Sequence, residues 1–160
     1  AISQTATGVK IELSGTNYGN HRILALDTAN GNAFNESSRQ TINIQTTTFN
    51  GLLERIKVDP RELGLIWIDT QGHEGHVLSC ADVIEKTNTP IVLEFWPYGL
   101  QRSGGYPMLR QLFQRSSRIY DLSTSLNGQK PLSLDQLDQL YQANSLGKKA
   151  AFWHADLLIL

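Results

Sequence analysis

The sequence predicts an α/β fold with a largely parallel sheet, in a single domain that spans residues 1–160. From residue 64 onward, short apolar runs and helical patterns follow one another in the order strand, helix, strand, helix, strand, helix, strand. Strands that are separated by helices need crossover connections, which favour parallel pairing. The strand at 91–96 opens with three consecutive apolar residues, as expected for a strand buried on both faces.

Two half-buried strands and one helix precede this alternating region. Residues 9–13 and 41–46 alternate apolar and polar side chains, which is the strand period. Residues 17–22 read as a polar turn, and residues 27–38 as an exposed loop. A helix begins after Thr48, a suitable N-cap, and ends near Pro60.

The later elements follow from the same patterns. Strands are expected at 64–69, 118–122 and 155–160, and the last of them runs antiparallel to the sheet. Apolar residues at helical spacing predict helices after residue 74, after residue 105 and after Ser133. Ser133 and Gln136 have the capping-box pattern of a helix start.

Composition and charge exclude several classes of partner. The net charge is -1 and no basic run is present, so neither nucleic acid nor a membrane is expected as a partner. No apolar stretch approaches the roughly 20 residues of a membrane-spanning helix. Cys80 is the sole cysteine, so no internal disulfide can form, which fits a reducing compartment and a cytoplasmic location.

The strand at 64–69 ends in Asp69, the best candidate for a functional residue. In open α/β sheets, ligands bind in the crevice beyond the carboxyl ends of the strands. Gln71, Gly72 and Glu74 follow at once, and Gly72 allows a tight turn or the close approach of a ligand. The alternatives are that Asp69 caps the next helix and that Glu74 is an ordinary acid of its first turn.

Glu94 ends the next strand and would share an edge with Asp69 if the two strands are parallel neighbours. Trp96 follows, so an acid and an aromatic ring could line a small-molecule pocket there, or form an exposed rim. Asn17, His21 and Arg22 form a polar cluster that is either a solvated turn or a contact for a carboxylate or phosphate.

Two other patterns carry less weight. His73, His76 and Cys80 fall at helical spacing, but the two histidines are one residue too close for the H-E-x-x-H pattern, so no metal ligands are assigned. The segment 25–32 contains Gly31 but lacks the G-x-G-x-x-G spacing of a nucleotide loop.

The segment 66–78, I-W-I-D-T-Q-G-H-E-G-H-V-L, resembles the "I-K-I-D-V-E/Q-G-x-E-x-x-V-L" signature of FkbM-type methyltransferases. The strand after Gly8, the segments 17–23 and 47–53, and the strand that ends in Glu94 follow the order of that family. The resemblance covers most of residues 1–100 and weakens in the C-terminal third.

This resemblance implies a Rossmann-like class I methyltransferase sheet and an O-methyltransferase that uses S-adenosylmethionine. The implied methyl acceptor is a small-molecule or sugar hydroxyl. Asp69 and Glu94 would be catalytic, orienting the acceptor or taking its proton, and Asp69, Gln71 and Gly72 would contact the cofactor. The implied substrate contacts are Asn17, His21, Arg22, Glu74 and Trp96.

The glycine-rich first motif of the family does not precede the first strand here. The sequence is therefore expected to begin after the third strand of the full sheet, with the cofactor half missing and the edge of strand 64–69 open, where an oligomer could form. Two alternatives remain: a non-catalytic α/β interaction module, and a metal-dependent hydrolase that uses Asp69, His73 and His76.

Overall fold

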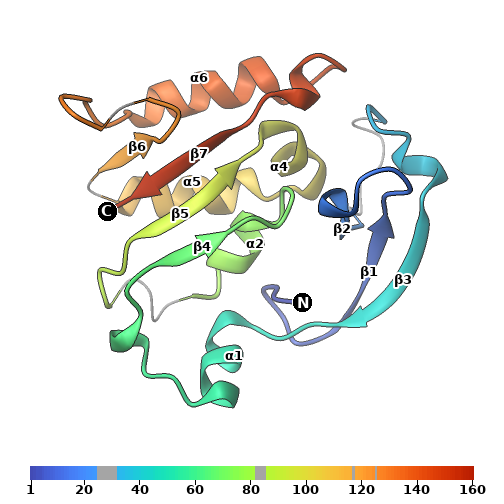
Figure 1. The fold of residues 1–160 in the computed structure, drawn as a ribbon, viewed down its shortest axis with the longest axis horizontal. Helices are drawn as coiled ribbons and strands as arrows, with labels where there is room; N and C mark the ends of the chain where they lie inside the picture. Colours follow the sequence, from blue (N-terminus) through green and yellow to red (C-terminus); the bar gives the residue numbers. More distant parts are fainter. Residues whose placement is uncertain (25–31, 82–85, 117, 125) are drawn as a thin grey trace.

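The computed structural model describes residues 1–24, 32–81, 86–116, 118–124 and 126–160, which form two β-sheets with flanking helices (Figure 1). The segment 25–32, considered above as a nucleotide loop, lies almost entirely outside the described residues. In the described part of the chain, every helix is too short to cross a lipid bilayer.

The larger sheet is mixed and has the order β4-β5-β7-β6 (β4 Ile66–Ile68, β5 Ile91–Phe95, β7 Ala155–Ile159, β6 Ile119–Asp121). β4 and β5 pair in parallel, with Ile68 opposite Leu93. β7 is antiparallel to both of its neighbours, β5 and β6. The expected antiparallel last strand is confirmed, but of the three strand pairs described in this sheet only β4–β5 is parallel, so the sheet is mixed where a largely parallel one was predicted.

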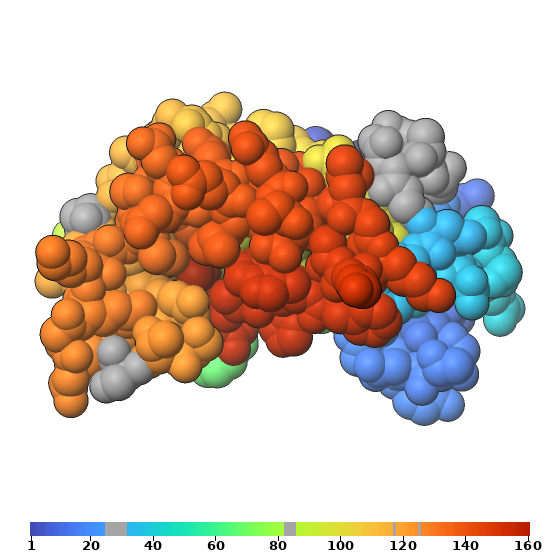
Figure 2. All heavy atoms as spheres, turned by 90° about the horizontal axis from the view of Figure 1, so that it is seen from above, coloured from blue at the N-terminus to red at the C-terminus, as the bar shows by residue number. Residues whose placement is uncertain are grey.

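The first strands of the chain form a separate antiparallel sheet of order β2-β1-β3 (β1 Gly8–Leu13, β2 Arg22–Ile23, β3 Gln40–Gln45). The two strands expected at 9–13 and 41–46 are confirmed by β1 and β3. β2 was not predicted, because two residues are too few to show a period. Figures 1 and 2 show this sheet, in blue to cyan, at one end of the molecule.

Several local predictions about helices are confirmed. The helices are α1 Phe49–Ile56, α2 Glu74–Leu78, α4 Pro97–Ser103, α5 Tyr106–Arg115 and α6 Leu134–Asn144. Thr48 caps α1 by accepting a hydrogen bond from Gly51 N, and Ser133 and Gln136 form the capping box of α6. α1 ends at Lys57, which has a left-handed backbone, three residues before Pro60. α4 was not predicted, since Pro97 and two glycines obscure its pattern.

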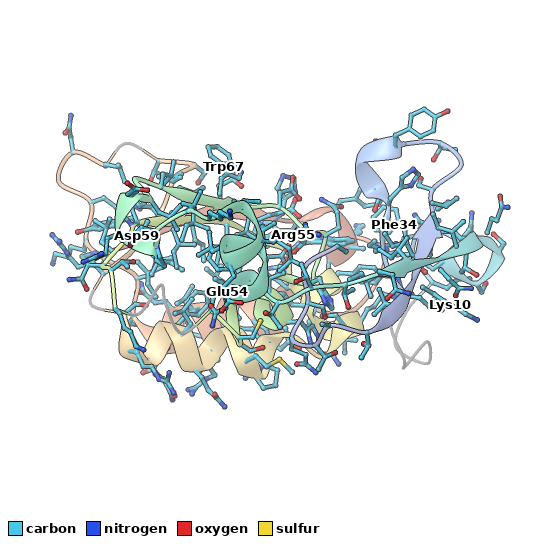
Figure 3. The ribbon with its side chains drawn as sticks, turned by 90° about the horizontal axis from the view of Figure 1, so that it is seen from below. Lys10, Phe34, Glu54, Arg55, Asp59 and Trp67 are labelled. Atoms are coloured by element: carbon cyan, nitrogen blue, oxygen red, sulfur yellow. The ribbon has the colours of Figure 1, made fainter. Side chains whose placement is uncertain are left out.

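The main core lies between the mixed sheet and the helices on one of its faces. Leu93 and Leu157 of the sheet are fully buried in the same cluster as Leu109 of α5 and Leu137 of α6. On β4, Ile66 and Ile68 are buried and Trp67 is 66% exposed, because successive strand residues point to opposite faces. Figure 3 shows Trp67 projecting away from the helix-covered face.

A buried ion-pair cluster joins the antiparallel sheet to α4. Arg22 of β2 contacts Glu12 of β1 at 2.5 Å and Glu36 at 2.8 Å, and Arg102 of α4 contacts the same two carboxylates at 3.0 and 3.2 Å. Tyr98 donates a hydrogen bond to Glu36 at 2.7 Å. Since Glu36 is buried, in the short helix η3 (Glu36–Ser38), the expectation of an exposed loop is wrong at this position.

The turn from β4 into α2 fits against α4 through glycines. Gly72 has a φ of +95°, and a Cβ built there would lie 2.3 Å from the carbonyl carbon of Gly99. A Cβ on Gly99 would in turn lie 2.9 Å from the Cα of Gly72. The backbones of Gly72 and Gly99 are therefore so close that no side chain fits at either position. The space that Gly72 was expected to offer a ligand is filled by the backbone of Gly99.

We expect Gly72→Ala to lower the free energy of unfolding by about 3 kcal/mol or more, because it adds a backbone clash and strain at positive φ. The matched control is Gly64→Ala, where an added Cβ meets nothing within 4 Å. Urea denaturation followed by circular dichroism would measure both variants. Equal, small losses in the two would show that the contact between Gly72 and Gly99 is dispensable.

Candidate functional site

Asp69 and Glu94 lie side by side at the carboxyl ends of β4 and β5. The parallel register, with Ile68 opposite Leu93, places the next residues of the two strands together. Gln71 Nε2 donates to Asp69 Oδ1 at 2.8 Å and to Glu94 Oε2 at 3.0 Å. The expectation that the two acids share one edge is confirmed.

The structure rules out the capping alternative for Asp69. The N-cap position of α2 is occupied by His73, which makes no side-chain capping bond. Asp69 is exposed and lines a cavity, so its carboxylate is accessible to a ligand.

Glu74 lies close to Asp69 and Glu94 and is completely buried. Its Oε1 accepts hydrogen bonds from Thr70 N at 2.8 Å, from Thr70 Oγ1 at 3.0 Å and from Gly72 N at 3.2 Å. Glu74 therefore holds the turn between β4 and α2 in shape, which in turn fixes Asp69 and Gln71. Burial raises its pKa above the ordinary value of 4.5.

Burial also raises the pKa of Glu94 to about 8, and repulsion by Asp69, Glu74 and Asp156 adds to the shift. Asp156 lies directly opposite Glu94 in the β5–β7 register. None of the ion pairs between described residues includes any of these four carboxylates, so no cation offsets their repulsion there. Glu94 thus holds a proton near neutral pH beside the exposed Asp69.

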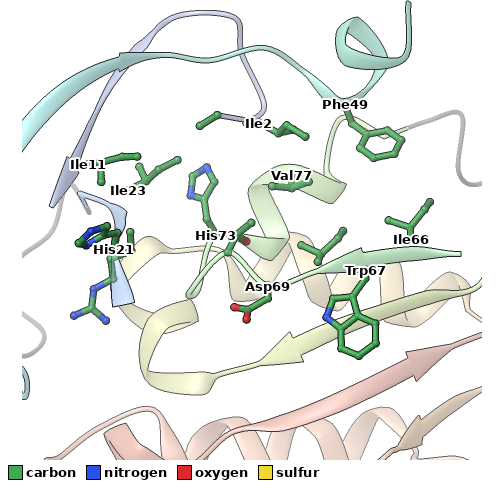
Figure 4. A pocket seen from close by; sticks show the side chains of 14 residues that line it. Ile2, Ile11, His21, Ile23, Phe49, Ile66, Trp67, Asp69, His73 and Val77 are labelled. Atoms are coloured by element: carbon green, nitrogen blue, oxygen red, sulfur yellow. The ribbon is translucent and has the colours of Figure 1, made fainter. Parts of the chain in front are cut away.

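A cavity of about 350 Å³ opens between the edge of β4 and the antiparallel sheet (Figure 4). This volume falls within the range of small-molecule sites. Figure 4 shows Asp69 and Trp67 on the β4 side, His73 and Val77 from the turn and α2, and Phe49 from α1. The other lining residues are Ala1, Ile2, Ile11, His21, Arg22, Ile23, Ile66, Ile68 and Thr70. The walls are mostly apolar, with Asp69, Thr70 and His73 on one side and His21 and Arg22 on the side of the antiparallel sheet.

His73 contributes a neutral ring to this cavity. Burial, with a smaller effect of His76, lowers the pKa of His73 to about 4. Its Nε2 lies 3.0 Å from Ser3 Oγ, and its ring stacks on that of His76 at 4.4 Å between centroids. Among the described residues, the histidines belong to no three-residue group with metal-ligand spacing, and Cys80 Sγ contacts backbone carbonyls. This geometry does not favour a hydrolase based on Asp69, His73 and His76.

The remaining predicted contacts are spread over the molecule. His21 and Arg22 line the cavity, although Arg22 is 5% exposed and already engaged in the ion-pair cluster. Asn17 caps the short helix η1 (Tyr18–Asn20) by accepting from Gly19 N, and it is not among the cavity residues. Trp96 is buried, and its Nε1 donates to Ala151 O at 2.8 Å, so it supports the fold beside the site.

Sequence reasoning missed two features of the site. No local sequence pattern predicts the apolar wall of the cavity that β1, β2 and α1 form, because this wall depends on how the two sheets meet. Arg102, buried in the ion-pair cluster, lies on the unpredicted helix α4.

A family model described as "Methyltransferase FkbM domain" matches residues 4–119. No curated protein and no solved structure matches the chain. The matched range includes Asp69, Gln71, Glu74 and Glu94, and it extends across both sheets.

The pKa of Glu94 gives stability a characteristic pH dependence. Folding raises this pKa from the ordinary 4.5 to about 8, so between these values the folded chain holds a proton that the unfolded chain releases. Through this residue, the free energy of unfolding falls as the pH rises from about 4.5 to 8. Glu94→Gln cannot titrate, so we expect its stability relative to the wild type to increase over that range.

Denaturation midpoints at pH 5, 6.5 and 8.5 would measure this difference. Glu54→Gln, on the exposed face of α1, is the control and should differ from the wild type equally at every pH. A difference between Glu94→Gln and the wild type that does not change with pH would contradict the assigned pKa.

Proposed function

The chain belongs to the FkbM methyltransferase family, and from this premise we propose that it supplies the acceptor side of an S-adenosylmethionine-dependent O-methyltransferase. The observation that carries the proposal is the pair of carboxyl groups, Asp69 and Glu94, which Gln71 joins and of which Asp69 lines a cavity. The acceptor is a hydroxyl of a small molecule or a sugar.

S-adenosylmethionine would supply the methyl group as an electrophilic sulfonium. The protein must then hold the acceptor in line and provide a destination for the hydroxyl proton. Asp69 is suited to both tasks, because it is exposed and lines the cavity. Glu94 is protonated near neutral pH, so the two neighbouring carboxyl groups take different roles, with Asp69 as the base.

The described residues fit the acceptor better than they fit the cofactor. A nucleotide-like ligand needs a glycine-rich turn that exposes backbone to it. Here the backbone of Gly72 is covered by Gly99, and Gln71 is engaged with two carboxylates. We therefore derive no step that depends on cofactor contacts from these residues.

The sheet supports a placement within the Rossmann-like class I architecture. β4 and β5 are parallel, β7 is antiparallel, and among the described residues β4 pairs with a strand on one side only. In this proposal, β4 to β6 form one half of the sheet, and the open edge of β4 faces the other half.

A second candidate function is an interaction module without catalysis, and the same edge favours it. Trp67 of β4 is 66% exposed and Leu65, just before the strand, is 50% exposed, which suits pairing with another chain or with a second copy. In this alternative Asp69 has no chemical role.

Asp69 distinguishes the two candidates. In an active preparation that contains residues 1–160, Asp69→Ala and Asp69→Asn should lower kcat by about 100-fold or more, because the acceptor loses its base. Glu54→Gln should retain full turnover. Wild-type kcat in both Asp69 variants, with unchanged thermal stability, would exclude the acceptor-side role.

The covered glycines also predict weak cofactor binding. Calorimetric titration of S-adenosylmethionine into residues 1–160 should show no binding in the micromolar range. A stoichiometric micromolar signal would show that the described residues, as they stand, suffice for the cofactor.

A further inference from the structure

We propose that Asp69, Glu74 and Glu94 form a binding site for one divalent cation of the hard, oxygen-preferring class, such as Mg²⁺ or Ca²⁺. The site lies where β4, α2 and β5 meet. A role for the cation in activating the acceptor hydroxyl rests on the function proposed above, whereas binding of the cation does not.

The spacing of the three carboxylates suits a shared ion. One oxygen from each of them can be chosen so that all three lie within 4.8 Å of one another. Two ligand oxygens of one ion can be no further apart than twice the metal–oxygen distance, which is about 4.6–5.2 Å for Ca²⁺ and about 4.0–4.2 Å for Mg²⁺. The separation of the three carboxylates is therefore compatible with a shared Ca²⁺, and small side-chain shifts would adjust it for either ion.

Glu74 provides an independent reason to expect a ligand. All three hydrogen bonds described above reach its Oε1. Its Oε2 is buried, and no hydrogen-bond partner for it exists among the described residues. A buried carboxylate oxygen without a partner is costly, and a cation among the three carboxylates would satisfy it.

The charge of the site points to a cation as well. Asp69, Glu74, Glu94 and the neighbouring Asp156 bring four acids together, and none of them is in an ion pair with a described residue. A proton on Glu94 relieves part of the repulsion, and a divalent ion would relieve more of it.

Gln71 has the chemistry of a fourth ligand. Its amide nitrogen now spans Asp69 and Glu94, at 2.8 and 3.0 Å. A half-turn of the amide would present its oxygen to the same place, and amide oxygens are ligands for both Mg²⁺ and Ca²⁺. The amide nitrogen thus stands in for the positive charge when the ion is absent.

The test uses Mn²⁺ alone, which binds to oxygen ligands and is read directly by electron paramagnetic resonance. Titration of residues 1–160 at pH 8.5 should show one Mn²⁺ bound per chain.

Two variants locate the ion. Asp69→Asn and Glu94→Gln should each weaken Mn²⁺ binding by at least about tenfold, because each removes a charged ligand. Glu54→Gln is the matched control and should bind as the wild type does. Circular dichroism would check that each variant is folded; Asp69 is exposed, so its variant tests the site even if Glu94→Gln unfolds.

Absence of Mn²⁺ binding at pH 8.5, or binding that neither variant changes, would overturn the proposal. Because the assay contains no cofactor and no acceptor, its failure would leave the methyltransferase proposal intact. Conversely, full turnover in an Asp69 variant would refute the acceptor-side role without affecting the cation site.

Discussion

The close approach of Gly72 to Gly99 is the constraint on which the candidate site depends. It sets the path of the chain between β4 and α2 and holds that turn against α4. With the path fixed, Thr70 and Gly72 direct their N–H groups at Glu74, and Gln71 reaches across to Glu94. A side chain at either glycine would separate the two elements and displace the turn that holds Gln71 and Glu74 beside the paired ends of β4 and β5.

The convergence places like charges together, so the site stores unfavourable electrostatic energy that the rest of the fold must offset. The buried cluster of Leu93, Leu109, Leu137 and Leu157 supplies stabilisation next to it. Such an arrangement is common at functional sites, where carboxyl groups in different surroundings acquire different proton affinities. Asp69 at the cavity and Glu94 between three other acids illustrate this difference.

Local patterns in the sequence predict a large part of this molecule. Thr48 and the capping box at Ser133 mark two helix starts correctly, because capping is a contact between near neighbours. The proximity of Asp69 and Glu94 follows from parallel pairing of two adjacent strands. Buried Glu36 was missed because its burial depends on pairing with arginines that are distant in the sequence, and the helix α4 was missed because Pro97 and Gly99 obscure its pattern. The wall of the cavity depends on the meeting of two sheets, which no local pattern encodes.

The ion-pair cluster of Glu12, Arg22, Glu36 and Arg102 has an evolutionary consequence. Each carboxylate is shared by both arginines, so the loss of any one charge unbalances the charge of a buried cluster. The energetic effects of substitutions at these positions are therefore strongly non-additive. Single substitutions at these four positions are therefore selected against. Homologous chains should carry either all four charged residues or apolar residues at all four positions.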